Sequence, residues 1–209
     1  MHEPAAGLTA EKIHVWRGDR HVLRGVSFAA EPGRLLHVYG PNGTGKTTLL
    51  RVLCGLLRPE SGVVRWGTEA IETIRSDYQR AMTYASHEAA LKGDLTALEN
   101  LRYAVGLKRR VADEELRATL ERTGVGPCAD LPARVLSAGQ RRRVAMARVL
   151  AMRSALWLLD EPYTNLDAKG GELLTALLDE HAGAGGIALV VAHHALPLAG
   201  AVARLELAA

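Results

Sequence analysis

Cysteine is scarce in this sequence, and long apolar runs are missing. The two cysteines, Cys54 and Cys128, form no CxxC pair and have no histidine at metal-ligand spacing beside them, so we expect neither a disulfide framework nor a zinc site. A reducing cytosol suits such a chain. No run approaches the roughly 20 apolar residues that span a bilayer, and no basic residue precedes an apolar stretch at the start. Any membrane role is therefore expected to depend on a partner.

Net charge and aromatic residues are low as well. The 26 lysines and arginines barely exceed the 23 acidic residues, and a net charge of +3 is too small to indicate nucleic-acid binding. Aromatic residues make up 4%, charged residues 23% and hydrophobic residues 48%, which is typical of a folded globular protein and not of a disordered one. The length of 209 residues favours a single domain over residues 1–209.

Short apolar runs alternate with helical patterns along the chain, which predicts an α/β fold. Three runs are nearly continuous in apolar residues, as strands buried on both faces of a parallel sheet usually are. They are residues 35–39 (LLHVY), 155–159 (ALWLL) and 187–192 (IALVVA). Apolar residues recur every three or four positions in three further segments, which indicates helices. These segments are residues 47–57, 113–122 and 139–151.

The N-terminal part and the middle of the chain differ in pattern. Residues 8–16 and 21–28 precede a Glu-Pro-Gly turn sequence and are predicted to form an antiparallel hairpin. Residues 88–154 carry good helix formers without a clear strand. We expect them to form a helical subdomain inserted into a core of about residues 1–87 and 155–209. Loops within the insertion are indicated by Gly124, Gly126, Pro127 and Pro132.

A phosphate-binding motif follows the first apolar run and precedes a helical pattern. It matches GxxxxGK followed by Ser or Thr, and both flanks agree with a P-loop rather than with a glycine-rich turn that exposes a lysine. The motif and the residue after it are Gly40, Pro41, Asn42, Gly43, Thr44, Gly45, Lys46, Thr47 and Thr48. Glycines let backbone N–H groups surround phosphates, Lys46 is expected to reach the β- and γ-phosphates of ATP, and Thr47 to ligate Mg²⁺.

Two acidic residues stand where the second apolar run ends. Asp160 is predicted to ligate Mg²⁺, which binds oxygen ligands. Glu161, one residue later, is predicted to face the γ-phosphate and to take a proton from the attacking water. The alternative is a pair of solvated acids at a strand end, and the complete P-loop makes it the weaker interpretation.

The segment Leu136-Ser137-Ala138-Gly139-Gln140, followed by three arginines, resembles the LSGGQ signature of ABC ATPases, with alanine at the middle glycine. The P-loop, the acidic pair, residues 165–167 in the place of the D-loop and His193 in that of the switch histidine follow the family's order and spacing. The resemblance covers essentially the whole chain. It implies an ABC-type P-loop NTPase core of mainly parallel sheet, with an antiparallel N-terminal hairpin and an inserted α-helical subdomain.

The same resemblance implies that two copies of the domain bind head to tail, each ATP lying between the P-loop of one copy and the signature helix of the other. Ser137, Gly139 and Gln140 are then expected to complete the ATP site of the second copy. The segment Arg141–Arg143 is expected to be a solvated helix face rather than a nucleic-acid patch. Trp16 stands where an aromatic residue stacks on adenine in this family, and simple packing is its alternative.

Two histidines are further candidates at the ATP site. His193 is expected, by its match to the family, to act as a catalytic residue beside Glu161 and Lys46, in preference to its neighbour His194, which should face the other way. The family's Q-loop glutamine is missing from residues 84–88 (YASHE), and His87 lies nearest to its place. His87 is expected to touch Mg²⁺ or its water; Glu88 in that role, or a surface position for His87, is the alternative.

Within the family, the short chain, His87, residues 95–101 (LTALENL) and the segment LSAGQRRRVAMARV look most like the ATP-binding subunits of cytochrome c maturation systems. That implies ATP hydrolysis at the cytoplasmic face of the membrane to power haem delivery, with permease partners similar to CcmB and CcmC and no nucleic acid. The alternatives are an ABC transporter with another cargo, and a soluble ABC-type ATPase acting on nucleic acid or ribosomes.

Overall fold

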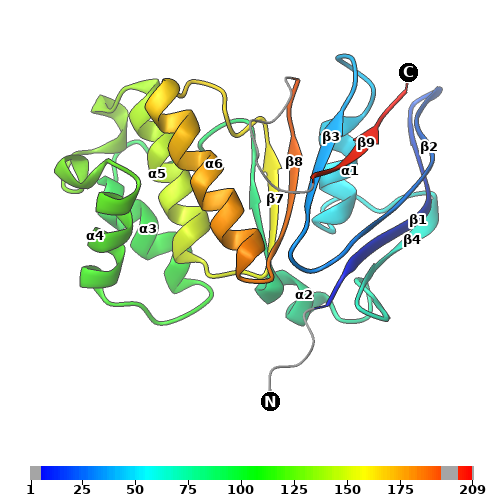
Figure 1. Ribbon diagram of the computed structural model, residues 1–209, viewed down its shortest axis with the longest axis horizontal. Coiled ribbons are helices and arrows are strands. Elements are labelled where there is room, and N and C mark those ends of the chain that lie inside the picture. Colours follow the sequence, from blue (N-terminus) through cyan, green and yellow to red (C-terminus); the bar gives the residue numbers. More distant parts are fainter. Residues whose placement is uncertain (1–5, 194–201, 209) are drawn as a thin grey trace.

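A computed structural model describes residues 6–193 and 202–208, and it contains two sheets flanked by helices (Figure 1). The larger sheet has five parallel strands in the order β6-β7-β8-β3-β9. Its strands are β3 (Leu35–Tyr39), β6 (Met82–Ala85), β7 (Leu156–Asp160), β8 (Ile187–Val191) and β9 (Val202–Glu206). The three predicted buried strands are β3, β7 and β8, each within one residue of the predicted bounds, which confirms the α/β class.

The second sheet is antiparallel and has four strands in the order β2-β1-β4-β5. Its strands are β1 (Leu8–Arg17), β2 (Arg20–Ala30), β4 (Ser61–Trp66) and β5 (Glu69–Ala70). The predicted N-terminal hairpin is confirmed as β1 and β2. The sequence did not predict β4, which pairs with the other edge of β1 and extends the hairpin into a sheet.

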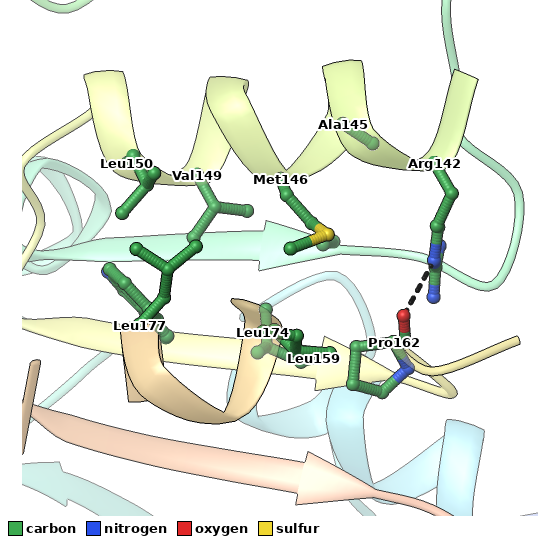
Figure 2. A pocket seen from close by; sticks show the side chains of 11 residues that line it. Arg142, Ala145, Met146, Val149, Leu150, Leu159, Pro162, Leu174 and Leu177 are labelled. Carbon is green, nitrogen blue, oxygen red and sulfur yellow. Dashed lines mark hydrogen bonds between the residues drawn. The ribbon is translucent and has the colours of Figure 1, made fainter. Parts of the chain in front are cut away.

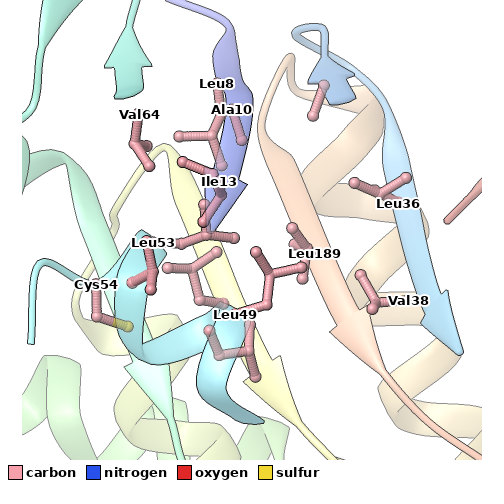
Figure 3. Packing of buried hydrophobic residues seen from close by; sticks show 14 of the residues in the cluster. Leu8, Ala10, Ile13, Leu36, Val38, Leu49, Leu53, Cys54, Val64 and Leu189 are labelled. Atoms are coloured by element: carbon pink, nitrogen blue, oxygen red, sulfur yellow. The ribbon is translucent and has the colours of Figure 1, made fainter. Parts of the chain in front are cut away.

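Helix α1 (Lys46–Leu53) lies between the two sheets (Figures 1 and 3). Its leucines meet Leu8, Ile13 and Val64 of the antiparallel sheet and Leu189 of the parallel one in one buried cluster. The helix is shorter than the predicted 47–57. It stops because Gly55 takes a left-handed φ of 68°, and the next two N–H groups turn back to the carbonyl of Arg51.

Helix α2 (Arg75–Ala81) lies on the same side as α1, because its Tyr78 is buried in the same cluster and donates to the carbonyl of Leu53. On the other side of the parallel sheet are α3 (Ala97–Gly106), α4 (Asp113–Arg122), α5 (Ala138–Ala151) and α6 (Ala168–Gly183). Helices α3, α4 and α5 stand together at the left of Figure 1 and share a buried cluster of their own. Helix α5 also packs Met146 and Val149 against β7 and α6, so it connects this group to the sheet. None of the helices in the described ranges is long and apolar enough to cross a membrane.

Candidate functional site

The P-loop joins β3 to α1 and needs glycine at two of its positions. Gly40 has a φ of 145°, and a Cβ there would lie 2.4 Å from the carbonyl oxygen of Leu207. Gly45 has a φ of 99°, and its Cβ would lie 2.8 Å from side-chain atoms of Leu23 and Val22. Both conformations are strained for other residues, and neither site has space for a side chain. The loop therefore packs closely against β2 and against the segment after β9.

Lys46 is folded over this loop. Its side chain is only 7% exposed, and Nζ donates hydrogen bonds to the carbonyl oxygens of Gly40 (2.8 Å) and Pro41 (2.9 Å). Thr44 is buried within the same loop, and its hydroxyl donates to the same Pro41 oxygen at 3.0 Å. The ammonium is thus fixed inside the loop, where an anion would find a positive charge with little water around it.

Thr47 and Asp160 meet although they are far apart in the sequence. The hydroxyl Oγ1 of Thr47 donates to Oδ2 of Asp160 at 2.9 Å, and Asp160 is buried at the end of β7. These neighbouring oxygens are of the hard type that Mg²⁺ binds, so the residues present fit that ion. Cys54 lies nearby, and its burial raises the pKa of its thiol to about 12, with a smaller contribution from the charge of Asp160. The thiol therefore stays protonated and does not compete with these oxygens for a metal ion.

Glu161 follows in an unusual backbone conformation. Its φ of 49° is left-handed, which costs on the order of 1 kcal/mol for a residue with a side chain. Its Oε1 lies 3.1 Å from Nε2 of His193, but it is buried and accepts no well-oriented hydrogen bond from any residue in the described ranges. A buried carboxylate oxygen with a free acceptor position can bind the proton of a water molecule.

These groups line one open cavity of about 510 Å³ at the carboxyl ends of the parallel strands. It brings together most of the residues predicted from the sequence for nucleotide, metal and catalysis. They are Asn42, Gly43, Gly45, Lys46, Thr47, Thr48, His87, Asp160, Glu161 and His193. Gly40, Pro41 and Thr44 form the base of the same loop. Across the part of the chain that is described, no three His, Cys, Asp or Glu side chains form a metal site, so any Mg²⁺ here would keep water or phosphate ligands.

The other predicted residues lie away from this cavity. Trp16 is half exposed on β1 and stacks on His21, with ring centroids 4.2 Å apart. Ser137 and Gln140 form a capping box at the exposed start of α5: the Ser137 hydroxyl accepts from the Gln140 N–H, and Gln140 Oε1 accepts from the Ser137 N–H. Gly139 packs against the carbonyl of Asn165, where a Cβ would lie 3.1 Å away. His194 lies outside the described residues.

Sequence reasoning missed two arginines that line the cavity, Arg17 and Arg20. They face each other across the β1–β2 turn, and Nη2 of Arg20 donates to the carbonyl of Gly43 at 2.8 Å. The turn sequence Arg-Gly-Asp-Arg was the available signal, because it brings two cations to one end of the predicted hairpin. With Lys46 they make the cavity attractive to phosphates.

The expected solvated face at Arg141–Arg143 is wrong for its central member. Arg142 is buried, because it points from α5 toward the end of β7, where polar backbone groups surround it. Arg143 is largely covered as well and binds Oδ1 of Asp167 at 2.6 Å, which lowers the pKa of that carboxyl. Asp167 also caps α6 through the N–H of Gly170.

Comparison with known proteins agrees with this geometry. The sequence profile described as "ABC transporter" matches residues 23–164, which include the P-loop, the LSAGQ segment and the acidic pair. The chain belongs to the ABC transporter family. It therefore has the ABC-type ATPase fold, binds ATP and is an ATP-hydrolysing subunit of that type.

Curated relatives are similar over nearly the whole chain. The cytochrome c biogenesis ATP-binding export protein CcmA of Nitrosococcus oceani is 48% identical over 92% of this chain and 88% of its own. The protein of the same name from Methylococcus capsulatus is 46% identical over 97% of this chain and 98% of its own. Among solved structures, the ATP-binding cassette MJ0796 matches with a TM-score of 0.78 and 26% identity. The match covers 90% of this chain and 88% of that one, which is a dimer in a post-hydrolysis state bound to ADP and Pi.

Proposed function

We propose that this chain is the ATP-hydrolysing subunit of an export complex for cytochrome c biogenesis, and that it powers haem delivery. The observation that carries the proposal is the similarity, at 46% identity over 97% of the chain, to a protein named for that role. The cavity supports it, because the loop, the acidic pair and the histidine of an ATPase site meet there. The fold alone would support an ABC transporter with any cargo.

The hydrolytic roles follow from the positions of the side chains. Lys46 and the N–H groups of the P-loop neutralise phosphate charge, and Thr47 and Asp160 would hold Mg²⁺, with His87 touching it or its water. When bound, Mg²⁺ would add positive charge to the phosphate oxygens. Glu161 accepts the proton of the attacking water through its free Oε1, and His193, 3.1 Å away, orients the same water and the γ-phosphate.

The complete ATP site requires a second copy of the chain. Ser137, Gly139 and Gln140 lie at the exposed start of α5 and outside the cavity of their own copy. The positive end of a 14-residue helix is a suitable partner for a phosphate. In the proposed dimer it contacts the γ-phosphate held by the P-loop of the other copy. The dimeric state of the related cassette MJ0796 supports this arrangement.

A second surface suits a membrane subunit. A groove of about 410 Å³ runs between β6, the end of α1 and helix α3. Three large apolar side chains stand exposed along it, which are Leu56 (65%), Tyr103 (52%) and Leu107 (74%). Exposed apolar groups gathered at one groove are typical of a protein interface. We assign the groove to a cytoplasmic segment of a CcmB-like permease, with a CcmC-like subunit in the same complex at the cytoplasmic face of the membrane.

Affinity isolation of the tagged chain from detergent-solubilised membranes tests this function. Permease and haem-handling subunits are expected to co-purify with the wild type. Leu107→Glu places a charge in the groove and should abolish co-purification while ATP binding persists, whereas Leu131→Glu, at an exposed leucine outside the groove, should leave both intact. Recovery of another permease would contradict the haem role. A salt-sensitive association with RNA or DNA alone would favour the soluble ATPase instead.

A further inference from the structure

Arg142 uses its whole hydrogen-bonding capacity inside the protein. The side chain is only 4% exposed, and a guanidinium carries five N–H donors in a planar fork. Nε donates to the carbonyl of Pro162 at 3.0 Å, and Figure 2 shows this bond near the start of α5. The other four N–H groups reach backbone carbonyls too, those of Ser86 (3.0 Å), His87 (3.2 Å), Asp160 (3.1 Å) and Glu161.

These carbonyls belong to two separate loops that border the ATP cavity. One loop follows β6 and contains His87; the other follows β7 and contains Glu161. In the described part of the chain, no backbone N–H bonds to the carbonyls of Ser86, His87 or Pro162. Arg142 is therefore the protein donor that reaches all three, and without it the buried carbonyl of Pro162 would lose its partner and the two loops would lose the bonds that join them.

The surroundings offer no replacement for Arg142. The small cavity beside it, about 20 Å³, is lined otherwise by apolar side chains of α5, α6 and the sheet (Figure 2). A water needs at least two polar partners to stay in such a place. In the described residues no carboxylate forms an ion pair with Arg142, so its contacts hold backbone rather than side chains.

The contact with Glu161 has a particular consequence. The left-handed backbone of Glu161 is strained, and such a conformation persists only where its surroundings hold it. Arg142 Nη2 binds the carbonyls on both sides of the Glu161 Cα, those of Asp160 and Glu161 itself. The orientation of the Glu161 side chain, and hence of its free Oε1, depends on this backbone.

We propose that Arg142 is a positioning residue for ATP hydrolysis, one that fixes the Glu161 and His87 loops relative to each other and ties both to the signature helix α5. The inference rests on the proposed hydrolytic role of Glu161. Because α5 begins with the segment that would meet the ATP of the second copy, a movement of α5 on dimer closure would be transmitted through Arg142 to both loops.

Steady-state kinetics of Arg142→Lys and Arg142→Met test the proposal. Arg142→Met should lower kcat at least about tenfold while KM for ATP stays within about twofold, because the P-loop is untouched and Glu161 is misplaced. Arg142→Lys keeps the charge but has only three donors, so its kcat should lie between those of Arg142→Met and the wild type. The lysine variant also keeps the test valid if the methionine variant folds poorly.

The matched control is Arg109→Met. Arg109 is another partly buried arginine with several bonds, including two to the carbonyl of Ala151 at the far end of α5. This variant should lower Tm with kcat unchanged. If the kcat of Arg142→Met lies within about twofold of the control, or if kcat and KM change together, the positioning role is overturned.

Hydrogen exchange provides a readout that does not depend on activity. The amides of Glu161 and Thr164 are hydrogen-bonded, to the carbonyls of Val191 and Glu161, and should exchange faster in Arg142→Met than in Arg109→Met. Unchanged protection would overturn the inference. Failure of the proposed function would appear differently, as absence of ATP hydrolysis in the wild type itself.

Discussion

At the scale of single residues, Glu161 has the most directly testable role. Its free Oε1 is the proton acceptor in the proposed reaction, so Glu161→Gln should still bind ATP but lower kcat by at least about a hundredfold. The variant should also accumulate as a closed dimer with ATP. Turnover of radiolabelled ATP and size-exclusion chromatography measure the two effects. Glu172→Gln, at an exposed position on α6, is the control, and near-normal hydrolysis by Glu161→Gln would contradict the assignment.

Single residues also show where sequence reasoning succeeds. The P-loop and the acidic pair were predictable because their chemistry demands fixed residue types at fixed spacing. The burial of Arg142 was missed, because three successive arginines look alike by residue type alone. Helical spacing places Arg142 on the same face of α5 as Ala145, Met146 and Val149, which are all buried. This apolar face of the helix indicated that the charge of Arg142 is buried as well. Its partners are backbone carbonyls, which no sequence pattern reveals.

At the scale of elements, burial decided what could be predicted. Strands β3, β7 and β8 are covered on both faces, so their sequences are continuous apolar runs and the bounds were right within one residue. Strand β9 is largely exposed and its sequence VARLE carries no such run. Helix α6 contains Gly170 and Gly171, which weaken a helical pattern. Gly170 is nevertheless suited to its place, because a Cβ there would lie 2.8 Å from the capping Oδ1 of Asp167.

The end of α6 gives the fold a pH dependence. His181 stacks on Trp157 of β7 with centroids 3.8 Å apart, and its Nε2 binds the carbonyl of Ile187 at 3.2 Å. Burial lowers the pKa of His181 below its usual 6.5, although the backbone carbonyls oppose the shift. The unfolded chain therefore takes up a proton first as pH falls through about 6.5, and the free energy of unfolding decreases.

Removal of this histidine should flatten that dependence. In His181→Phe, which keeps a ring against Trp157, the free energy of unfolding is expected to fall less between about pH 7.5 and pH 5.5 than in the wild type. Urea unfolding at several pH values measures it. His181→Gln, which keeps a hydrogen-bond donor, should show the same flattening. Equal slopes in the wild type and both variants would refute the contribution of His181.

At the scale of the whole molecule, the proposed dimer makes each ATP site a joint product of two copies. One copy supplies Lys46 and Glu161, and the other supplies Ser137 and the start of α5. Within one copy, Ser137 and the start of α5 do not line the cavity that contains Lys46 and Glu161. The two contributions can therefore be damaged separately, in different copies, and recombined.

Mixing two inactive variants should restore activity. Lys46→Ala removes the phosphate-binding charge, and Ser137→Arg obstructs the start of α5; each alone should reduce hydrolysis to background. In an equimolar mixture half of the dimers are mixed and each has one intact site, so up to about a quarter of wild-type activity is expected. The control is a mixture of Lys46→Ala with the double variant Lys46→Ala/Ser137→Arg. No dimer in it has an intact site, so it should stay inactive. If the first mixture also stays inactive, or if Ser137→Arg alone hydrolyses ATP at the wild-type rate as a monomer, then sharing of sites between copies is wrong.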